Sequence, residues 1–323
     1  MTLVSIGIPT FERAERLRRA AESALAQTHG DLEVVISDNA STDGTRELCE
    51  ALCKRDPRVR YLRAPVNRGP TANFNQLYAA VNGEFAMMLS DDDWLERNYV
   101  ERCLEALQAD PARALVCGRA RYVRDGASVR RGAPLSLENR DPGTRVLAYL
   151  RTVDENGLFY GLARREQLLR ATPLRNVLGN DWLVVLGMLA QGTAVTLEET
   201  SIVRELGGTS ADFARLARTL GLPRAQALVP HLVIASQVLA EIGWRAPAFR
   251  GLSLRERVVL APRAALAAID WRSAAWHATL PAAASAGRHR WSRPLWRAYL
   301  RVTRALGAAH DGLVDDAPPP PGR

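Results

Sequence analysis

Over the first 90 residues, continuous apolar runs alternate with segments in which apolar residues recur at helical spacing. This pattern predicts strands separated by helices. Short, continuous apolar runs predict buried strands, and they occupy residues 3–8, 32–37, 59–63 and 84–89. Apolar residues at helical spacing predict the intervening helices, at residues 13–27, 45–55 and 70–81. This alternation indicates βαβ units, and therefore an α/β fold with a mostly parallel sheet.

Polar residues that could bind a ligand or take part in a reaction come directly after these strands. They are Thr10, Asp38 and the triplet Asp91, Asp92 and Asp93. Ligands of open α/β sheets bind at the carboxyl ends of the strands. We therefore expect these side chains to converge on one crevice.

The aspartate triplet needs a partner, because adjacent carboxylates repel one another at the end of a buried element. A divalent metal or another cation relieves that repulsion. The alternative is structural: the three residues cap a helix and form its acidic first turn ahead of Trp94. The loop SDNASTDGT, residues 37–45, has two interpretations as well. It is either a plain turn, or a ligand loop in which Asp38 accepts hydrogen bonds from a base or a ribose.

Composition narrows the class of protein. The 323 residues are 47% hydrophobic and 24% charged, as in ordinary globular chains, and the net charge of +8 favours anionic partners. The four cysteines follow no zinc spacing and are expected to be reduced and packed, which suits the cytosol. The N-terminal apolar run stops at Pro9, and no stretch reaches about 18 uninterrupted apolar residues, so we expect neither a signal peptide nor a transmembrane span. No GxGxxG follows the first strand, and no nucleic-acid-binding module is recognised.

Four motifs together resemble the family 2 inverting glycosyltransferases of the GT-A fold. They are IPTFER at residues 8–13, SDNASTDGT at 37–45, NRGPTANFN at 67–75 and LSDDDWL at 89–95. The resemblance extends over residues 3–210. It implies a Rossmann-like, mostly parallel sheet flanked by helices, and an enzyme that moves a sugar from a nucleoside diphosphate donor.

The resemblance also implies a set of site residues. Those expected to bind the nucleotide sugar are Pro9, Thr10, Glu12, Asp38, Arg68, Gly69, Asn73, Asp91 and Asp92. The expected metal ligands are Asp93 and Asp91, and the expected metal is Mn²⁺ or Mg²⁺. Because successive strand residues point to opposite faces, Asp91 and Asp93 are expected on one side and Asp92 on the other. Ser90 stands where many relatives have the first acidic residue.

An inverting transfer needs a general base for the acceptor hydroxyl. In the resemblance this base falls on Asp181, in LGNDW at residues 178–182, where Asn180 replaces the usual Glu. The alternative is that Asp181 is the N-cap of the helix predicted at residues 182–191, and the two roles are compatible. Asp154 and Glu155 are the next candidates.

The segment IVRELGGTS, residues 202–210, resembles one that carries a histidine ligand in many relatives. This segment has no histidine; Arg204 is available to contact phosphate and Glu205 to approach the metal, and a surface hairpin is the alternative. Residues 211–310 predict a helical C-terminal region, with a basic amphipathic helix after Pro294 that either packs on the catalytic domain or contacts an anionic membrane. Residues 311–323 predict a disordered tail.

The resulting prediction is a GT-A domain at residues 1–210 that uses a UDP or dTDP sugar. The expected acceptor is a glycan or a lipid-linked glycan of cell-surface polysaccharide biosynthesis. The expected location is the cytoplasm, including a peripheral position at the inner face of the membrane, and no nucleic-acid partner is expected. The alternatives are a nucleotide-sugar binding or scaffolding module without transfer activity, and a nucleotidyltransferase.

Overall fold

The computed structural model describes residues 2–124, 126–153, 156–206 and 213–269. Its first half alternates strands and helices as the sequence predicts. The elements are β1 (Val4–Thr10), α1 (Ala14–Leu25), β2 (Leu32–Asp38), α2 (Thr45–Arg55), β3 (Val59–Arg63), α3 (Pro70–Ala80) and β4 (Phe85–Met88). The strands lie parallel in the order β3-β2-β1-β4. Their carboxyl ends therefore face the same side.

The second half extends this sheet to the order β3-β2-β1-β4-β9-β6-β10-β5. Its elements up to the last strand are β5 (Asp93–Leu95), α4 (Tyr99–Ala109), β6 (Arg113–Arg124), β7 (Ala127–Arg131), β8 (Ser136–Leu137), α5 (Pro142–Thr152), η1 (Gly157–Tyr160), β9 (Leu162–Arg164), α6 (Arg165–Ala171), α7 (Asn180–Gln191) and β10 (Thr193–Glu205). The long pairings are parallel, including β10 with β6, and the short pairings of β5, β7, β8 and β9 are antiparallel. The predicted mostly parallel sheet is confirmed.

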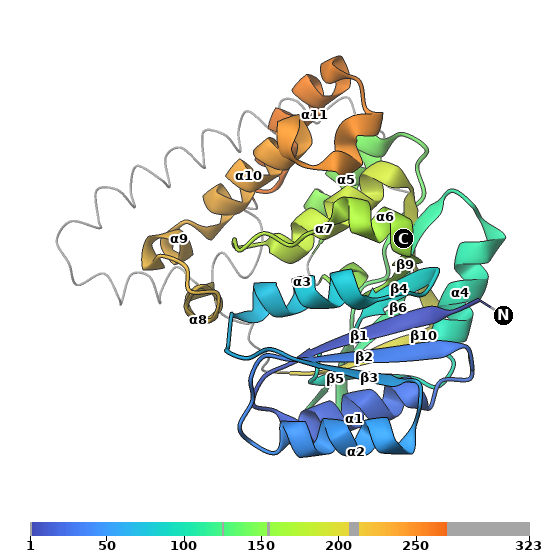
Figure 1. The fold of residues 1–323 in the computed structure, drawn as a ribbon. Helices are drawn as coiled ribbons and strands as arrows, with labels where there is room; N and C mark the ends of the chain where they lie inside the picture. The colour runs from blue at the N-terminus through green and yellow to red at the C-terminus, as the bar shows by residue number, and fades with distance from the viewer. Residues whose placement is uncertain (1, 125, 154–155, 207–212, 270–323) are drawn as a thin grey trace.

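Two buried cores cover the two faces of the sheet. One contains residues of α1, α2 and α4, such as Leu17, Leu48 and Tyr99. The other contains residues of α3, α5 and α7, such as Leu77 and Leu186. Figure 1 shows α1 and α2 on one face and α3 on the opposite face. This layering leaves the loops at the ends of the strands to form a site.

The described C-terminal helices pack on α5 and α7. They are α8 (Phe213–Thr219), α9 (Arg224–Leu228), α10 (Pro230–Ala240), η3 (Glu241–Arg245), η4 (Pro247–Gly251) and α11 (Leu254–Ala267). Ile234 and Leu260 share a buried core with Leu147 of α5 and Leu186 of α7, and Figure 1 shows α10 and α11 beside α5 and α7. The predicted boundary at residue 210 stays a prediction. The basic helix after Pro294 and the predicted tail lie outside the described residues.

No helix in the described part of the chain has both the length and the apolar character needed to cross a membrane.

Candidate active site

The carboxyl ends of β1, β2 and β3 bring three polar side chains together. Thr10, Asp38 and Arg63 are register partners on adjacent strands. The Thr10 hydroxyl donates to the Asp91 carboxylate at 2.9 Å, so the loop after β4 joins the same place. Thr10 thus lies beside Asp38 and contacts Asp91, whereas the single crevice expected for all these side chains stays a prediction.

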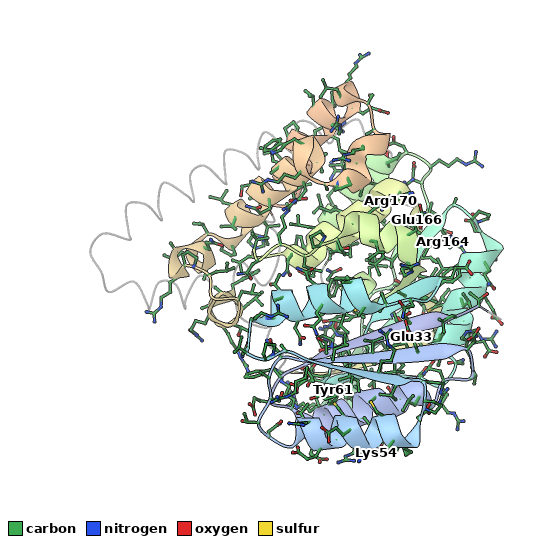
Figure 2. All side chains as sticks on the ribbon, in the orientation of Figure 1. Glu33, Lys54, Tyr61, Arg164, Glu166 and Arg170 are labelled. Atoms are coloured by element: carbon green, nitrogen blue, oxygen red, sulfur yellow. The ribbon has the colours of Figure 1, made fainter. Side chains whose placement is uncertain are left out.

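Asp38 is fully buried and is held by donors from the protein. One carboxylate oxygen accepts from the Ser41 amide at 2.8 Å, and the other accepts from the Tyr61 hydroxyl at 2.8 Å and from Arg63 Nε at 3.3 Å. Tyr61 is labelled in Figure 2, on the side of the sheet that α1 and α2 cover. The protein's own donors therefore occupy three of the roughly four acceptor positions of the carboxylate.

Two loops beside Asp38 are tied together in an uncommon backbone conformation. Glu12 and Ala40 have positive φ angles of 54° and 69°. The Glu12 carboxylate accepts from the Thr42 amide at 2.9 Å, and the Ser41 hydroxyl accepts from the Glu12 amide at 2.9 Å. Residues other than glycine in this conformation are strained and occur preferentially at ligand sites.

The NRG segment joins the site through asparagine side chains. Asn39 Nδ2 donates to Asn67 Oδ1 at 2.7 Å, and Asn39 Oδ1 accepts from the Arg68 amide at 2.9 Å. Gly69 has a φ of 81°, which suits glycine at the entrance to α3. The exposed Arg68 guanidinium donates to Gln76 at 3.0 Å. Asn39 and Asn67 were not among the predicted site residues, although both lie within the quoted motifs.

Asn73 is a positioning residue in this structure. Its amide nitrogen donates to the carbonyls of Thr10 and Ser37, at 3.2 and 2.9 Å, and its oxygen accepts from the Ser37 hydroxyl at 2.5 Å. Both donor hydrogens are thus used inside the protein. The side chain fixes the ends of β1 and β2, and its predicted contact with the nucleotide stays a prediction.

We expect Asn73→Ala to lower the free energy of unfolding by about 1–3 kcal/mol for each buried group that it leaves unsatisfied. Urea unfolding measures this loss. Asn75→Ala is the matched control, because Asn75 also bridges backbone groups, at Leu174, with distances of 3.0 and 2.8 Å. The affinity for the expected nucleotide-sugar donor should fall only in the Asn73 variant. Equal donor affinities in both variants would contradict a role for Asn73 in shaping the site.

Two members of the aspartate triplet, Asp91 and Asp92, pair with Arg13 and Arg16. Arg13 pairs with Asp91 at 3.0 Å and with Asp92 at 3.3 Å, and Asp92 also approaches Arg16 at 3.7 Å. The expectation that Asp92 points away from Asp91 is wrong, because these two residues lie in a turn and not in a strand. The helix-cap alternative is also wrong, because Trp94 lies in β5.

Asp93 begins β5 and faces Arg204 of β10. The two residues are register partners, and Arg204 Nε lies 3.3 Å from the Asp93 carboxylate. Arg204 also donates to the Tyr122 hydroxyl at 3.2 Å. The surface-hairpin alternative is wrong for residues 202–205, which lie between β5 and β6 in the sheet, whereas Gly207 and Gly208 are outside the described residues. Glu205 pairs with Arg19.

Burial is the largest influence on the pKa values of Asp91 and Asp93. It raises the pKa of Asp91 to about 6, against the opposing effect of Arg13. It raises the pKa of Asp93 to about 7, against the opposing effect of Arg204. Carboxylate oxygens are ligands that Mg²⁺ prefers, usually one or two of them together with substrate phosphates and water. Asp91 and Asp93 fit that chemistry; the described residues contain no three-residue group of His, Cys, Asp or Glu arranged for a metal, so further ligands would come from the donor and water.

Asp181 lies in the first turn of α7 and is held by Asn156. Asn156 Nδ2 donates to its carboxylate at 2.9 Å, and the Tyr149 hydroxyl donates to Asn156 Oδ1 at 2.8 Å. The residue at the N-cap is Gly179, so the prediction that Asp181 is the helix cap is wrong. Burial raises the pKa of Asp181, and the hydrogen bond from Asn156 opposes this. Asp154 and Glu155 lie outside the described residues.

Tyr160 connects Asp181 with the aspartate triplet. It ends η1, four positions after Asn156, and its ring centre lies 5.1 Å from the Arg204 guanidinium. Burial raises the pKa of Tyr160, and the Arg204 charge opposes this. Asp93, Asp92 and Asp181 raise it further. Asn156 at the start of η1 thus binds Asp181, and Tyr160 at its end contacts Arg204, the partner of Asp93, so this short helix connects the two carboxylates.

We expect Asn156→Ala to move the acid limb of kcat/KM to higher pH. A base acts in its ionised form, and loss of the Asn156 hydrogen bond raises the pKa of Asp181 further. Tyr149→Phe, which frees Asn156 from its own hydrogen bond, should give a smaller shift in the same direction. A pH profile of initial rates measures both. If the acid limb stays in place in Asn156→Ala, then Asp181 is not the group whose titration sets that limb.

The comparison with protein families decides the class. Residues 5–166, half of the chain, match the model described as Glycosyl transferase family 2. This chain belongs to glycosyl transferase family 2. The predicted family and glycosyltransferase class are thereby confirmed. Asp181 and Arg204 lie beyond the matched residues, so the case for them depends on geometry.

Known relatives of this family 2 chain include polysaccharide enzymes. The chondroitin synthase of Pasteurella multocida is 38% identical over 131 residues, which are 40% of this chain and only 14% of that protein. The putative colanic acid biosynthesis glycosyl transferase WcaA of Escherichia coli K12 is 29% identical over 189 residues, covering 58% of this chain and 67% of WcaA.

Solved structures agree with the predicted GT-A fold. The crystal structure of S. aureus TarS residues 1–349 in complex with UDP-GlcNAc superposes with a TM-score of 0.52 at 15% identity. The superposition covers 84% of this chain and 82% of that chain. The likeness confirms the fold.

Proposed function

We propose that this chain transfers a sugar from a UDP or dTDP sugar to an acceptor hydroxyl, with inversion at the anomeric carbon. The observation that carries the proposal is that η1 links two kinds of carboxylate: Asn156 at its N-cap binds Asp181, and the ring of Tyr160 at its end lies 5.1 Å from Arg204, the partner of Asp93. Asp93 is the first residue of β5, and Asp181 comes from α7. A donor-binding group and a separate base are the two parts that an inverting transfer requires.

The nucleotide sugar would bind at the carboxyl ends of β1, β2 and β4. The residues proposed to surround it are Pro9, Thr10, Glu12, Asp38, Arg68, Gly69, Asn73, Asp91 and Asp92. Asp38 and the strained loop at Glu12 and Ala40 would recognise the nucleoside. Arg68 is exposed at the entrance to α3 and is available to a phosphate oxygen.

Asp181 would act on the acceptor. Its carboxylate takes the proton of the acceptor hydroxyl while that oxygen forms a bond to the anomeric carbon. The bond between the anomeric carbon and the donor phosphate oxygen breaks on the opposite side, and the nucleoside diphosphate leaves with the bonding electrons. Asn156 and Tyr149 would keep the carboxylate oriented during this step.

Asp93 and Asp91 would hold a divalent cation, Mn²⁺ or Mg²⁺, which when bound neutralises the charge that develops on the leaving diphosphate. Both carboxylates are buried at the end of the sheet where the phosphates would lie.

The acceptor that we propose is a glycan or a lipid-linked glycan of a cell-surface polysaccharide. The support is the kind of relative that the chain resembles, a chondroitin synthase and a colanic acid biosynthesis enzyme by name. The four cysteines are free thiols, and three of them are buried. We therefore propose a reducing location, the cytoplasm or the inner face of the membrane.

A donor panel tests the proposal. The purified chain is incubated with UDP and dTDP sugars in Mn²⁺, Mg²⁺ or EDTA, and the released nucleotide is identified by chromatography. We expect nucleoside diphosphate to appear with a divalent metal and to stay near background in EDTA.

Two other results would replace the proposal. Binding of a donor without release of nucleotide, with and without glycan acceptors, would indicate a binding module. Release of pyrophosphate from a nucleoside triphosphate and a sugar phosphate would indicate a nucleotidyltransferase.

A further inference from the structure

Arg204 is placed by several independent contacts. Its Nε lies 3.3 Å from the Asp93 carboxylate, and its side chain is 18% exposed. The guanidinium carbon lies 5.6 Å from the Tyr122 ring centre and 5.1 Å from that of Tyr160. Tyr122 also accepts a hydrogen bond from Arg204 through its hydroxyl, at 3.2 Å. This aromatic cradle, formed by Tyr122 and Tyr160, keeps the charge of Arg204 inside the site.

The same Asp93 carboxylate is the proposed ligand of a divalent cation. A guanidinium in contact with a carboxylate and a metal ion on that carboxylate repel one another strongly at the low effective dielectric of a buried site. Arg204 and Asp93 are largely buried, so water screens the repulsion between the guanidinium and the metal ion only weakly. Arg204 contacts Asp93 Oδ2, so a metal ion on this carboxylate is opposed by the guanidinium for as long as that contact lasts.

A guanidinium released from Asp93 needs another anion. Its fork of N–H donors matches phosphate oxygens as well as it matches a carboxylate. The donor diphosphate would arrive at this end of the sheet, and the aromatic cradle does not depend on which anion the guanidinium contacts. Without the diphosphate, the exchange leaves a buried cation uncompensated.

We propose that Arg204 and the divalent cation exchange on Asp93, and that the diphosphate of the nucleotide accepts the displaced guanidinium. The inference rests on the proposed function, because it assumes a nucleoside diphosphate at this site. Its consequence is that metal and nucleotide bind cooperatively. By linkage, each raises the affinity for the other by the same factor.

The experiment measures Mn²⁺ binding and not turnover. Free hydrated Mn²⁺ is titrated by electron paramagnetic resonance, with and without saturating UDP, in the wild-type chain and in Arg204→Gln. We expect UDP to tighten Mn²⁺ binding to the wild type by about 5- to 150-fold, the usual range of coupling between sites. Arg204→Gln should bind Mn²⁺ more tightly than the wild type when UDP is absent, and should lose most of the coupling.

Two further variants make the result specific. Arg204→Lys keeps a positive charge near Asp93, so its Mn²⁺ affinity without UDP should stay close to that of the wild type. Asp93→Asn combined with Arg204→Gln should lose the gain in affinity, because the ligand itself is gone. A purely structural role for Arg204 predicts the opposite sign, since a disturbed site binds metal more weakly.

The outcomes separate this inference from the proposed function. Unchanged or weaker Mn²⁺ binding in Arg204→Gln, or no Mn²⁺ binding in any variant, would overturn the exchange. If the expected binding pattern appears but no donor releases nucleotide, the exchange stands and the proposed transfer fails. If nucleotide is released but the Mn²⁺ affinity is the same in the wild type and in Arg204→Gln, the proposed transfer stands and the exchange fails.

Discussion

Asp181→Asn should transfer sugar about 10²- to 10⁴-fold more slowly than the wild type, the usual contribution of a positioned general base. The amide has the size of the carboxylate, and its oxygen can still accept from Asn156. It cannot take up the acceptor proton at neutral pH. Donor affinity should remain, because the residues proposed to bind the nucleotide lie at the ends of β1, β2 and β4. Initial rates of transfer and calorimetric titration with the donor measure the two quantities.

Stability provides the control for this variant. Burial raises the pKa of Asp181, so its negative charge is unfavourable in the folded state, and Asp181→Asn should be at least as stable as the wild type at neutral pH. Asp181→Ala also loses the acceptor of the hydrogen bond from Asn156 and leaves that amide unsatisfied. Both variants should therefore be folded, with Ala the less stable. Transfer at the wild-type rate by the Asn variant would show that Asp181 is not the base, and Asp154 or Glu155 would be tested next.

The first half of the fold follows directly from the sequence. The predicted helix at residues 45–55 and the predicted strand at residues 59–63 have the bounds that the structure shows. Their ends are marked by local signals, such as Gly44 with a φ of 87° in front of α2. Local periodicity and turn residues determine such elements, so one sequence is sufficient to predict them.

The partners of the site residues could not be predicted in the same way. Arg204 and Asp93 are 111 positions apart, and only the antiparallel pairing of β10 with β5 brings them together. Likewise, Asn156 reaches Asp181 across 25 positions. The sequence pointed to the neighbouring carboxylates Asp154 and Glu155, but hydrogen-bond partners depend on tertiary packing and leave no periodic signal.

The turn after β4 explains the error in the aspartate triplet. Strand alternation places Asp91 and Asp92 on opposite faces, but the strand begins only at Asp93. In the turn, both side chains reach Arg13 of the loop after β1. Arg13 lies in the quoted IPTFER motif, so a search for cations that balance the triplet would have identified it.

Asp93→Asn should nearly abolish metal-dependent turnover. Loss of a carboxylate that holds the charge-neutralising cation removes several kcal/mol of transition-state stabilisation, about 10²- to 10³-fold in rate. The Asn oxygen still accepts from Arg204, but the opposite charge is lost, so the free energy of unfolding should fall by about 1–3 kcal/mol. Release of nucleotide as a function of Mn²⁺ concentration measures the first effect, and urea unfolding measures the second.

Asp92→Asn is the matched control for Asp93→Asn, because it removes a neighbouring charge that pairs with Arg13 and Arg16 and not with Arg204. Its Mn²⁺ concentration for half-maximal rate should stay near that of the wild type. Adding Arg204→Gln to Asp93→Asn removes the unpaired guanidinium and should recover part of the lost stability, while turnover stays low. If stability and turnover instead recover together, Asp93 serves only to neutralise Arg204, and the metal must be held elsewhere.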